Sequence, residues 1–162
     1  MKRIAAIALG SNLASEWGDR AATLREAIQR IAQLGEVQAV SSFYDTAPVG
    51  YTEQPRFLNG ALLLETELEP IALMHALLAI ERTMGRDRTA APAKGPRVID
   101  LDLLLMGDVV LGPEDHADLT LPHPAMAERR FVLEPLAEIA PAMIDPISCK
   151  TVREMLAALS VQ

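Results

Sequence analysis

Hydrophobic positions along the chain change period several times, and these changes divide it into strands and helices. Residues 3–9 form an apolar run that ends at a Gly-Ser-Asn turn, as is typical of a strand. Over residues 19–34, apolar side chains recur every three or four positions, and Gly35 then follows as a helix terminator. The first part of the chain therefore predicts a strand followed by an amphipathic helix.

The same kind of pattern continues to residue 108. Strands are predicted over residues 36–44 and 57–66, separated by a loop with two prolines and a glycine. A second helix starts with Pro70 in its first position and stops at Gly85. A last strand is predicted within residues 95–108, which open and close on turn signals.

This order of elements, strand, helix, strand, strand, helix, strand, predicts an α+β fold. It is the ferredoxin-like βαββαβ arrangement, an antiparallel sheet with both helices on one face. C-terminal additions follow: an extended segment at 119–124 and a helical turn from about residue 129. A capping box at Thr151 and Glu154 starts a last helix. The length of 162 residues fits a single domain, 1–162.

Two carboxylates, Asp100 and Asp102, stand inside the most apolar run of the chain. Because side chains alternate across a strand, both point to one face, roughly 7 Å apart. Two like charges buried without a partner are costly, and Mg²⁺ is commonly held by one or two carboxylates together with water and substrate phosphates. An exposed strand end paired with arginine is the alternative for an isolated Asp-x-Asp. The apolar surroundings favour a metal.

Positive charge gathers just before this pair, although the formal net charge of the chain is −7. A solvated surface position explains any single arginine, but a cationic cluster beside paired acids is better explained by bridged phosphates. The polar stretch 86–94, which has no hydrophobic periodicity, is predicted to be a mobile loop. The cluster consists of Arg82, Arg86, Arg88, Lys94 and Arg97.

Composition narrows the possible partners and the compartment. The net charge argues against a protein that follows a nucleic-acid backbone by bulk charge. The single cysteine, Cys149, allows no internal disulfide and fits a reducing compartment. The apolar stretch 4–9 is too short for a signal peptide, and no run approaches a membrane span. We therefore expect a cytoplasmic protein, a monomer, without nucleic-acid or membrane partners.

Five segments in this order resemble one enzyme family, the 6-hydroxymethyl-7,8-dihydropterin pyrophosphokinases of folate biosynthesis. Gly-Pro-Arg followed by Asp-Leu-Asp is highly specific, and the match covers nearly the whole chain. The resemblance implies an ATP-dependent diphosphokinase that transfers pyrophosphate from ATP to the hydroxymethyl group of the dihydropterin, giving AMP and the pterin diphosphate. The segments are residues 10–13, 41–48, 54–59, 95–102 and 121–124.

The resemblance also implies site residues. Two Mg²⁺ ions would bind Asp100 and Asp102, which are catalytic together with Arg86 and Arg97. The pterin would be held by two aromatic rings, one amide and the backbone of one loop: Phe57, Phe131, Asn59, Thr46, Ala47 and Val49. ATP, the co-substrate, would be bound by arginines, a histidine and two further polar side chains: Arg86, Arg97, Arg129, His123, Glu81 and Thr120.

The chain departs from the family pattern near the ATP ligands. Lys94 stands where an aromatic residue is frequent, Asp118 stands where a basic residue is frequent, and the stretch before Lys94 is one residue longer. A nucleotide-binding relative that has lost the transfer reaction is therefore an alternative, but only these loop departures favour it.

Two other classes compete less well. A nucleotidyltransferase would have Gly-Ser about a dozen residues before its acidic pair, whereas here Gly10 and Asp100 are far apart. A ferredoxin-like RNA-binding module would need exposed aromatics on its central strands and a basic face. The first predicted strand has no aromatic residue, and the last carries two acids.

Overall fold

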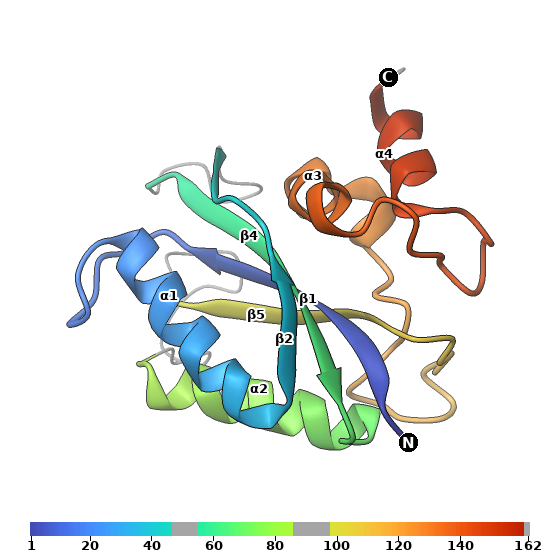
Figure 1. The fold of residues 1–162 in the computed structure, drawn as a ribbon, viewed down its shortest axis with the longest axis horizontal. Coiled ribbons are helices and arrows are strands. Elements are labelled where there is room, and N and C mark those ends of the chain that lie inside the picture. Colours follow the sequence, from blue (N-terminus) through green and yellow to red (C-terminus); the bar gives the residue numbers. More distant parts are fainter. Residues whose placement is uncertain (47–54, 86–97, 161–162) are drawn as a thin grey trace.

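An antiparallel sheet lies at the centre of the computed structural model, which describes residues 1–46, 55–85 and 98–160 (Figure 1). Its middle strand, β1 (Arg3–Ser11), pairs with β4 (Phe57–Thr66) on one side and with β5 (Asp100–Met106) on the other. β2 (Glu36–Val40) lies on the outer side of β4, which gives the order β2-β4-β1-β5.

The short strand β3 (Tyr44–Thr46) also pairs with β4. Chain order and sheet order together confirm the predicted ferredoxin-like α+β fold. No helix in the described ranges combines the length and the apolar character that crossing a membrane requires.

The two predicted helices cover one face of the sheet. α1 (Arg20–Ile31) starts where the Asp19 side chain accepts a hydrogen bond from the Ala22 N–H at 2.9 Å, and the short η1 (Ala32–Leu34) continues it. α2 (Pro70–Thr83) starts with proline in its first turn and stops before Gly85, whose φ of 98° suits glycine.

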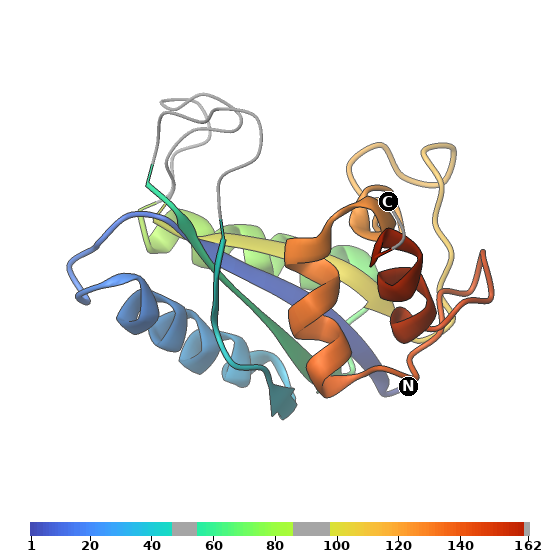
Figure 2. The same ribbon diagram turned by 90° about the horizontal axis from the view of Figure 1, so that it is seen from above.

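The C-terminal additions cover the opposite face (Figure 1). They are η2 (Met126–Glu128), α3 (Arg130–Ile139) and α4 (Val152–Ser160), and α3 and α4 lie side by side (Figure 2). The predicted capping box is confirmed: the Thr151 N–H donates to Glu154 Oε1 at 2.9 Å, and the Glu154 N–H donates to Thr151 Oγ1 at 3.1 Å.

Alternation along β1 separates the two core layers. Ala5, Ile7 and Leu9 pack toward α1 and α2, whereas Ala6 and Ala8 face α3 and α4. Successive side chains of a strand point to opposite faces, so one strand serves both layers. Small alanines on the second face let the C-terminal helices approach the sheet closely.

The prediction of one continuous strand over residues 36–44 is wrong, because the structure has two separate strands there. β2 ends at Val40, and β3 begins only at Tyr44. At the break, the Ser41 side chain accepts a hydrogen bond from the Ala61 N–H at 2.9 Å, and the Ser42 N–H donates to Glu138 on α3. The Ser41 N–H still donates to the Ala61 carbonyl, but the Ala61 N–H goes to the Ser41 hydroxyl in place of a backbone carbonyl, so the regular ladder is interrupted here. The predicted mobile loop, residues 86–94, lies outside the described residues.

Candidate functional site

One row of residues crosses three strands of the sheet. Asn59 on β4 pairs with Gly10 on β1, and Gly10 pairs with Asp100 on β5. Directly paired residues in antiparallel strands face the same side, so Asn59 and Asp100 flank a position without a side chain. A Cβ atom on Gly10 would lie 3.0 Å from Asn59 Oδ1, 3.9 Å from the Cβ of Asp100 and 3.9 Å from Cδ1 of Phe57. Only glycine fits between the amide, the carboxylate and the aromatic ring, because even a methyl group here would press on the Asn59 amide.

Asp100 and Asp102 lie on the same face of β5, as the alternation predicts. Asp102 pairs with Ala8, which packs among the residues under α3 and α4, so the acidic pair belongs to that face. Both acids are half-buried, whereas Leu101 and Leu103 between and after them are buried on the other face. The two carboxylates therefore stand at the edge of the apolar core with part of their surface open.

Glu81 supports this strand from beneath. It belongs to α2, is only 1% exposed, and its Oε2 accepts a hydrogen bond from the Leu101 N–H at 2.7 Å. A buried carboxylate needs such a donor to offset its desolvation. The bond fixes the backbone of β5 between the two aspartates. Glu81 therefore supports the acidic pair from the opposite face of the sheet.

The imidazole of His123 approaches the same face from the segment after β5. Its backbone N–H donates to the Leu104 carbonyl at 2.9 Å, and its Nδ1 accepts a hydrogen bond from the Ala125 N–H at 3.2 Å. Burial lowers the pKa of His123, the positive charge of Arg129 lowers it further, and Asp100 opposes the shift. Because Nδ1 is an acceptor, the proton of the neutral ring is on Nε2, which is a hydrogen-bond donor.

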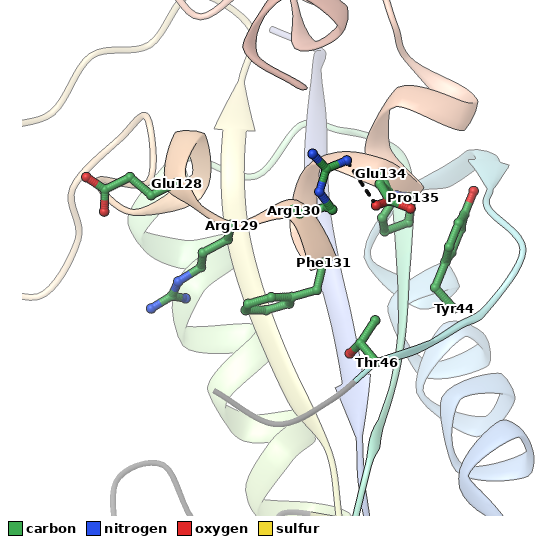
Figure 3. A pocket seen from close by; sticks show the side chains of 8 residues that line it. All are labelled: Tyr44, Thr46, Glu128, Arg129, Arg130, Phe131, Glu134 and Pro135. Atoms are coloured by element: carbon green, nitrogen blue, oxygen red, sulfur yellow. Dashed lines mark hydrogen bonds and ion pairs between the residues drawn. The ribbon is translucent and has the colours of Figure 1, made fainter. Parts of the chain in front are cut away.

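A pocket of about 330 Å³ lies between β3 and the start of α3 (Figure 3). Tyr44 and Thr46 come from the β3 side, and the other side chains come from η2 and α3 (Figure 3). The guanidinium of Arg129 lies 5.8 Å from the centre of the Phe131 ring, within the range of a cation–π contact. The pocket is lined by Tyr44, Thr46, Glu128, Arg129, Arg130, Phe131, Glu134 and Pro135.

Thr46 links this pocket to the row across the sheet. Asn59 is buried and donates from Nδ2 to Thr46 Oγ1, so its amide orientation is set and its Oδ1 faces the Gly10 position. Thr46 also pairs with Phe57. Three predicted pterin-binding residues, Thr46, Phe57 and Asn59, thus lie together at one end of the β3–β4 pair.

Ion pairs hold the same end of β3 and β4. Asp45 Oδ2 lies 3.0 Å from Arg20 Nη2, and Asp45 Oδ1 lies 2.8 Å from Arg56 Nε. The hydrogen bonds from Arg20 and then from Arg56 lower the pKa of the Asp45 carboxyl. Asp45 and Arg56 directly precede Thr46 and Phe57, so the cluster ties both strand ends to α1.

Some of the predicted site residues lie together in the structure, and others lie outside the described residues. The structure brings Thr46, Phe57, Asn59 and Asp100 together, and it places Phe131 and Arg129 at the pocket beside them. Thr120 is half-buried next to Leu121, which pairs with Leu111. Ala47, Val49, Arg86 and Arg97 lie outside the described residues.

Gly10 is not among the site residues predicted from the sequence, where Gly-Ser-Asn was interpreted as a turn at a sheet end. It is a strand residue, and a glycine inside a strand often marks a close approach of a ligand. That signal was present in the sequence. Glu134 and Arg130 of the pocket carried no comparable signal, because they form an ordinary surface pair one helical turn apart at 3.4 Å.

Comparison with known proteins adds a family match. A family model described as 7,8-dihydro-6-hydroxymethylpterin-pyrophosphokinase (HPPK) matches residues 6–141. The 2-amino-4-hydroxy-6-hydroxymethyldihydropteridine pyrophosphokinase of Bacillus subtilis is 45% identical over 141 residues, 86% of this chain and 79% of that protein. The protein of the same name from Methylorubrum extorquens is 43% identical over 155 residues, 94% of this chain and 91% of that protein.

Some relatives are much longer. The folic acid synthesis protein fol1 of Schizosaccharomyces pombe is 38% identical over 162 residues, 99% of this chain but only 21% of that protein. Among solved structures, a triple mutant of Plasmodium falciparum HPPK-DHPS aligns with a TM-score of 0.74 and 15% identity, covering 98% of this chain and 44% of that one. At this identity the likeness shows a shared fold. The chain spans less than half of each of these two longer proteins.

Proposed function

Because the chain belongs to the 7,8-dihydro-6-hydroxymethylpterin-pyrophosphokinase family, we propose that the pocket and the row from Asn59 to Asp100 together form its substrate site. The protein is a transferase of folate biosynthesis. It moves pyrophosphate from ATP to the hydroxymethyl group of 6-hydroxymethyl-7,8-dihydropterin, giving AMP and the pterin diphosphate. The observation that carries the residue assignment is the row Asn59–Gly10–Asp100, in which the amide and the carboxylate face the same side across a position that only glycine fits.

The pterin subsite is assigned to the Asn59 side of this row. A flat heterocycle gains from stacking between aromatic rings, which Phe57 and Phe131 supply. Asn59 Oδ1 is an acceptor with a set orientation, since Nδ2 of the same amide is bound to Thr46. An acceptor of this kind suits the N–H groups on the edge of a pterin. Backbone groups of Ala47 and Val49 belong to the same proposal.

The metal subsite is assigned to Asp100 and Asp102. Their donor set fits Mg²⁺, which takes oxygen ligands and keeps positions for water and substrate phosphates. Within the described ranges, no third His, Cys, Asp or Glu joins them in a metal-binding group, and two carboxylates suffice for such a site. Bound there, two Mg²⁺ ions would neutralise triphosphate charge and polarise the bonds at the transferred group.

The chain itself contributes positioning and charge. A pyrophosphoryl transfer needs an in-line arrangement of hydroxyl and phosphate more than covalent help. His123 would donate from Nε2 to the triphosphate, and Arg129 would add positive charge beside it. Arg86 and Arg97 are proposed to act on the same phosphates. Thr120 and Glu81 are assigned to the ATP site as well, Glu81 indirectly, through its hydrogen bond to the backbone of β5.

Asp100 has a second proposed role. It is the carboxylate in the same row as Asn59, so a pterin bound at Asn59 would extend its hydroxymethyl group toward it across Gly10. We assign to Asp100 the acceptance of the hydroxyl proton as the new bond to phosphorus forms. Removal of the proton prevents positive charge from building up on the attacking oxygen, while the bond between the attacked phosphorus and the AMP oxygen breaks.

Product analysis tests the proposed function. The protein is incubated with ATP, Mg²⁺ and 6-hydroxymethyl-7,8-dihydropterin, and the products are separated and identified by mass. AMP and the pterin diphosphate are expected in equal amounts, and turnover should stop when a chelator removes the metal. ADP with a pterin monophosphate would contradict the proposal. The same preparation in light scattering tests the predicted monomer. A cytoplasmic location and the absence of nucleic-acid partners stay predictions.

A further inference from the structure

The exposed carboxylate of Glu138, near the end of α3, is bound by three groups of the segment that leads into β3. The Ser42 N–H donates to Oε2 at 2.9 Å, the Ser42 hydroxyl donates to Oε1 at 2.8 Å, and the Tyr44 hydroxyl donates to Oε1 at 2.8 Å. The Ser42 backbone bond, followed by the Tyr44 and Ser42 hydroxyls, lowers the pKa of Glu138. The same contact raises the pKa of Tyr44. The carboxylate is therefore ionised when it makes these bonds at neutral pH.

These bonds join the two sides of the pocket shown in Figure 3. On α3, Phe131, Pro135 and Glu138 are spaced i, i+4 and i+7, so they lie on one face of the helix. On β3, Tyr44 and Thr46 are two residues apart and share one face of the strand. The Tyr44–Glu138 bond thus ties the helix face that carries Phe131 to the strand face that carries Thr46, the two walls that face each other in Figure 3.

β3 needs such a tie because it is short. It has three residues, and its described partner is β4 alone. Two residues before it, the Ser42 N–H donates to Glu138, whereas the neighbouring Ser41 N–H donates to the Ala61 carbonyl of β4. Without that acceptor, the start of β3 would keep its register with β4 but lose its fixed distance to α3.

We propose that Glu138 is a positioning residue for the pterin: its carboxylate sets the separation between the Phe131 side and the Thr46 side of the pocket. This inference rests on the proposed function, which places the pterin between Phe57 and Phe131. A preset gap lets the heterocycle enter without ordering the two walls itself, and such preorganisation raises affinity. Glu138 does not touch the reacting atoms, so its effect belongs to pterin binding.

Steady-state kinetics of Glu138→Ala test the inference. At saturating ATP and Mg²⁺, KM for the pterin should rise by about 5- to 30-fold, the loss expected when charge-assisted bonds to one carboxylate disappear. KM for ATP should stay within about twofold. Glu138→Asp, which keeps the charge on a shorter side chain, should restore part of the pterin affinity.

Glu154→Ala is the matched control. Glu154 is also an exposed carboxylate whose pKa is lowered by backbone and side-chain hydrogen bonds, but its partner is Thr151 at the start of α4. This variant should lower the thermal midpoint and leave KM for the pterin unchanged. If Glu138→Ala has wild-type pterin KM, or raises both KM values equally, the inference is overturned.

A milder pair of variants covers the case in which Glu138→Ala does not fold. Ser42→Ala removes a hydroxyl bond and keeps the backbone bond, so a smaller rise in pterin KM is expected. In the double variant with Glu138→Asp, the two effects should not add, because both changes act on the same bond. Additive effects would contradict the inference.

Failure of the inference and failure of the proposed function are separable. If the wild-type protein forms no AMP with the pterin, the proposed function fails. If the wild-type protein turns over and the Glu138 variants match it, only the inference fails.

Discussion

Asn59 and Asp100 face the same side of the sheet across Gly10, although their strands do not pair with each other. Both strands pair with β1, and the residue between them has no side chain. The amide that suits the pterin and the carboxylate that suits the metal are therefore both positioned by the backbone of β1. Their separation does not depend on the conformation of a loop.

Gly10→Ala should damage pterin binding selectively. Its Cβ would lie 3.0 Å from Asn59 Oδ1, so the buried amide must shift away from the pterin edge. KM for the pterin should rise by about tenfold, and the free energy of unfolding should fall by about 1–3 kcal/mol. Gly60→Ala is the control, since its Cβ would meet Phe43 Cδ1 at the same 3.0 Å but on the opposite face. That variant should lose stability without a selective loss of pterin affinity.

Asp100→Asn and Asp102→Asn should each lose at least about a hundredfold in turnover, because the charge that holds the metal is gone. Both proteins should remain folded, and relief of like-charge repulsion should leave the thermal midpoint equal or higher. Asp108→Asn, in the turn after the same strand, is the control and should retain activity. Magnesium-dependent turnover at the wild-type rate in either site variant would count against the metal role.

Phe57→Ala or Phe131→Ala should weaken the pterin more than ATP. Loss of one stacking partner costs about 1 kcal/mol beyond the buried area, or about fivefold in affinity. Titration of pterin fluorescence, set against titration with a non-hydrolysable ATP analogue, measures the two effects separately. Phe43→Ala removes a ring that packs on the other face and should reduce stability alone. Equal weakening of both ligands by the Phe57 or Phe131 change would indicate a purely structural ring.

Glu81→Ala should destabilise the fold and the site together. The Leu101 N–H would lose its buried acceptor, at a cost of about 1–3 kcal/mol in the free energy of unfolding. Urea denaturation measures this loss, and turnover should fall because the backbone between the two aspartates is no longer fixed. Glu81→Gln keeps an acceptor oxygen and should lose less of both. A Glu81→Ala protein with wild-type stability would show that the bond contributes nothing.

The protonation of His123 should make stability depend on pH on the acidic side of neutrality. Burial, then Arg129, holds its pKa below the ordinary value in the folded protein, so the unfolded chain binds the proton first as pH falls. The contribution is fully present above the ordinary histidine pKa and is lost as pH falls toward the folded value. His123→Gln should flatten this part of the curve of unfolding free energy against pH. An unchanged slope in that variant would assign the dependence to other groups.

Local signals along the chain were sufficient for much of this molecule. The strand over residues 57–66, the proline start of α2 and the capping box at Thr151 match the structure, because each depends on neighbours within a few positions. The shared face of Asp100 and Asp102 follows from strand alternation alone. The family motifs also lie in short, contiguous segments, so the chemistry could be predicted before any fold was known.

Tertiary structure decided how these parts meet. The row through Gly10 depends on β1 lying between β4 and β5. The break after Val40 depends on the hydrogen bonds of Ser41 with Ala61 and of Ser42 with Glu138. Each of these partners is remote in sequence. Neither the alternation of apolar and polar residues nor the turn residues indicate which strands will be neighbours in the sheet. Strand order and register are selected by the packing of the whole sheet against two helical layers, so the width of the pocket and the orientation of Asn59 exist only in the folded chain.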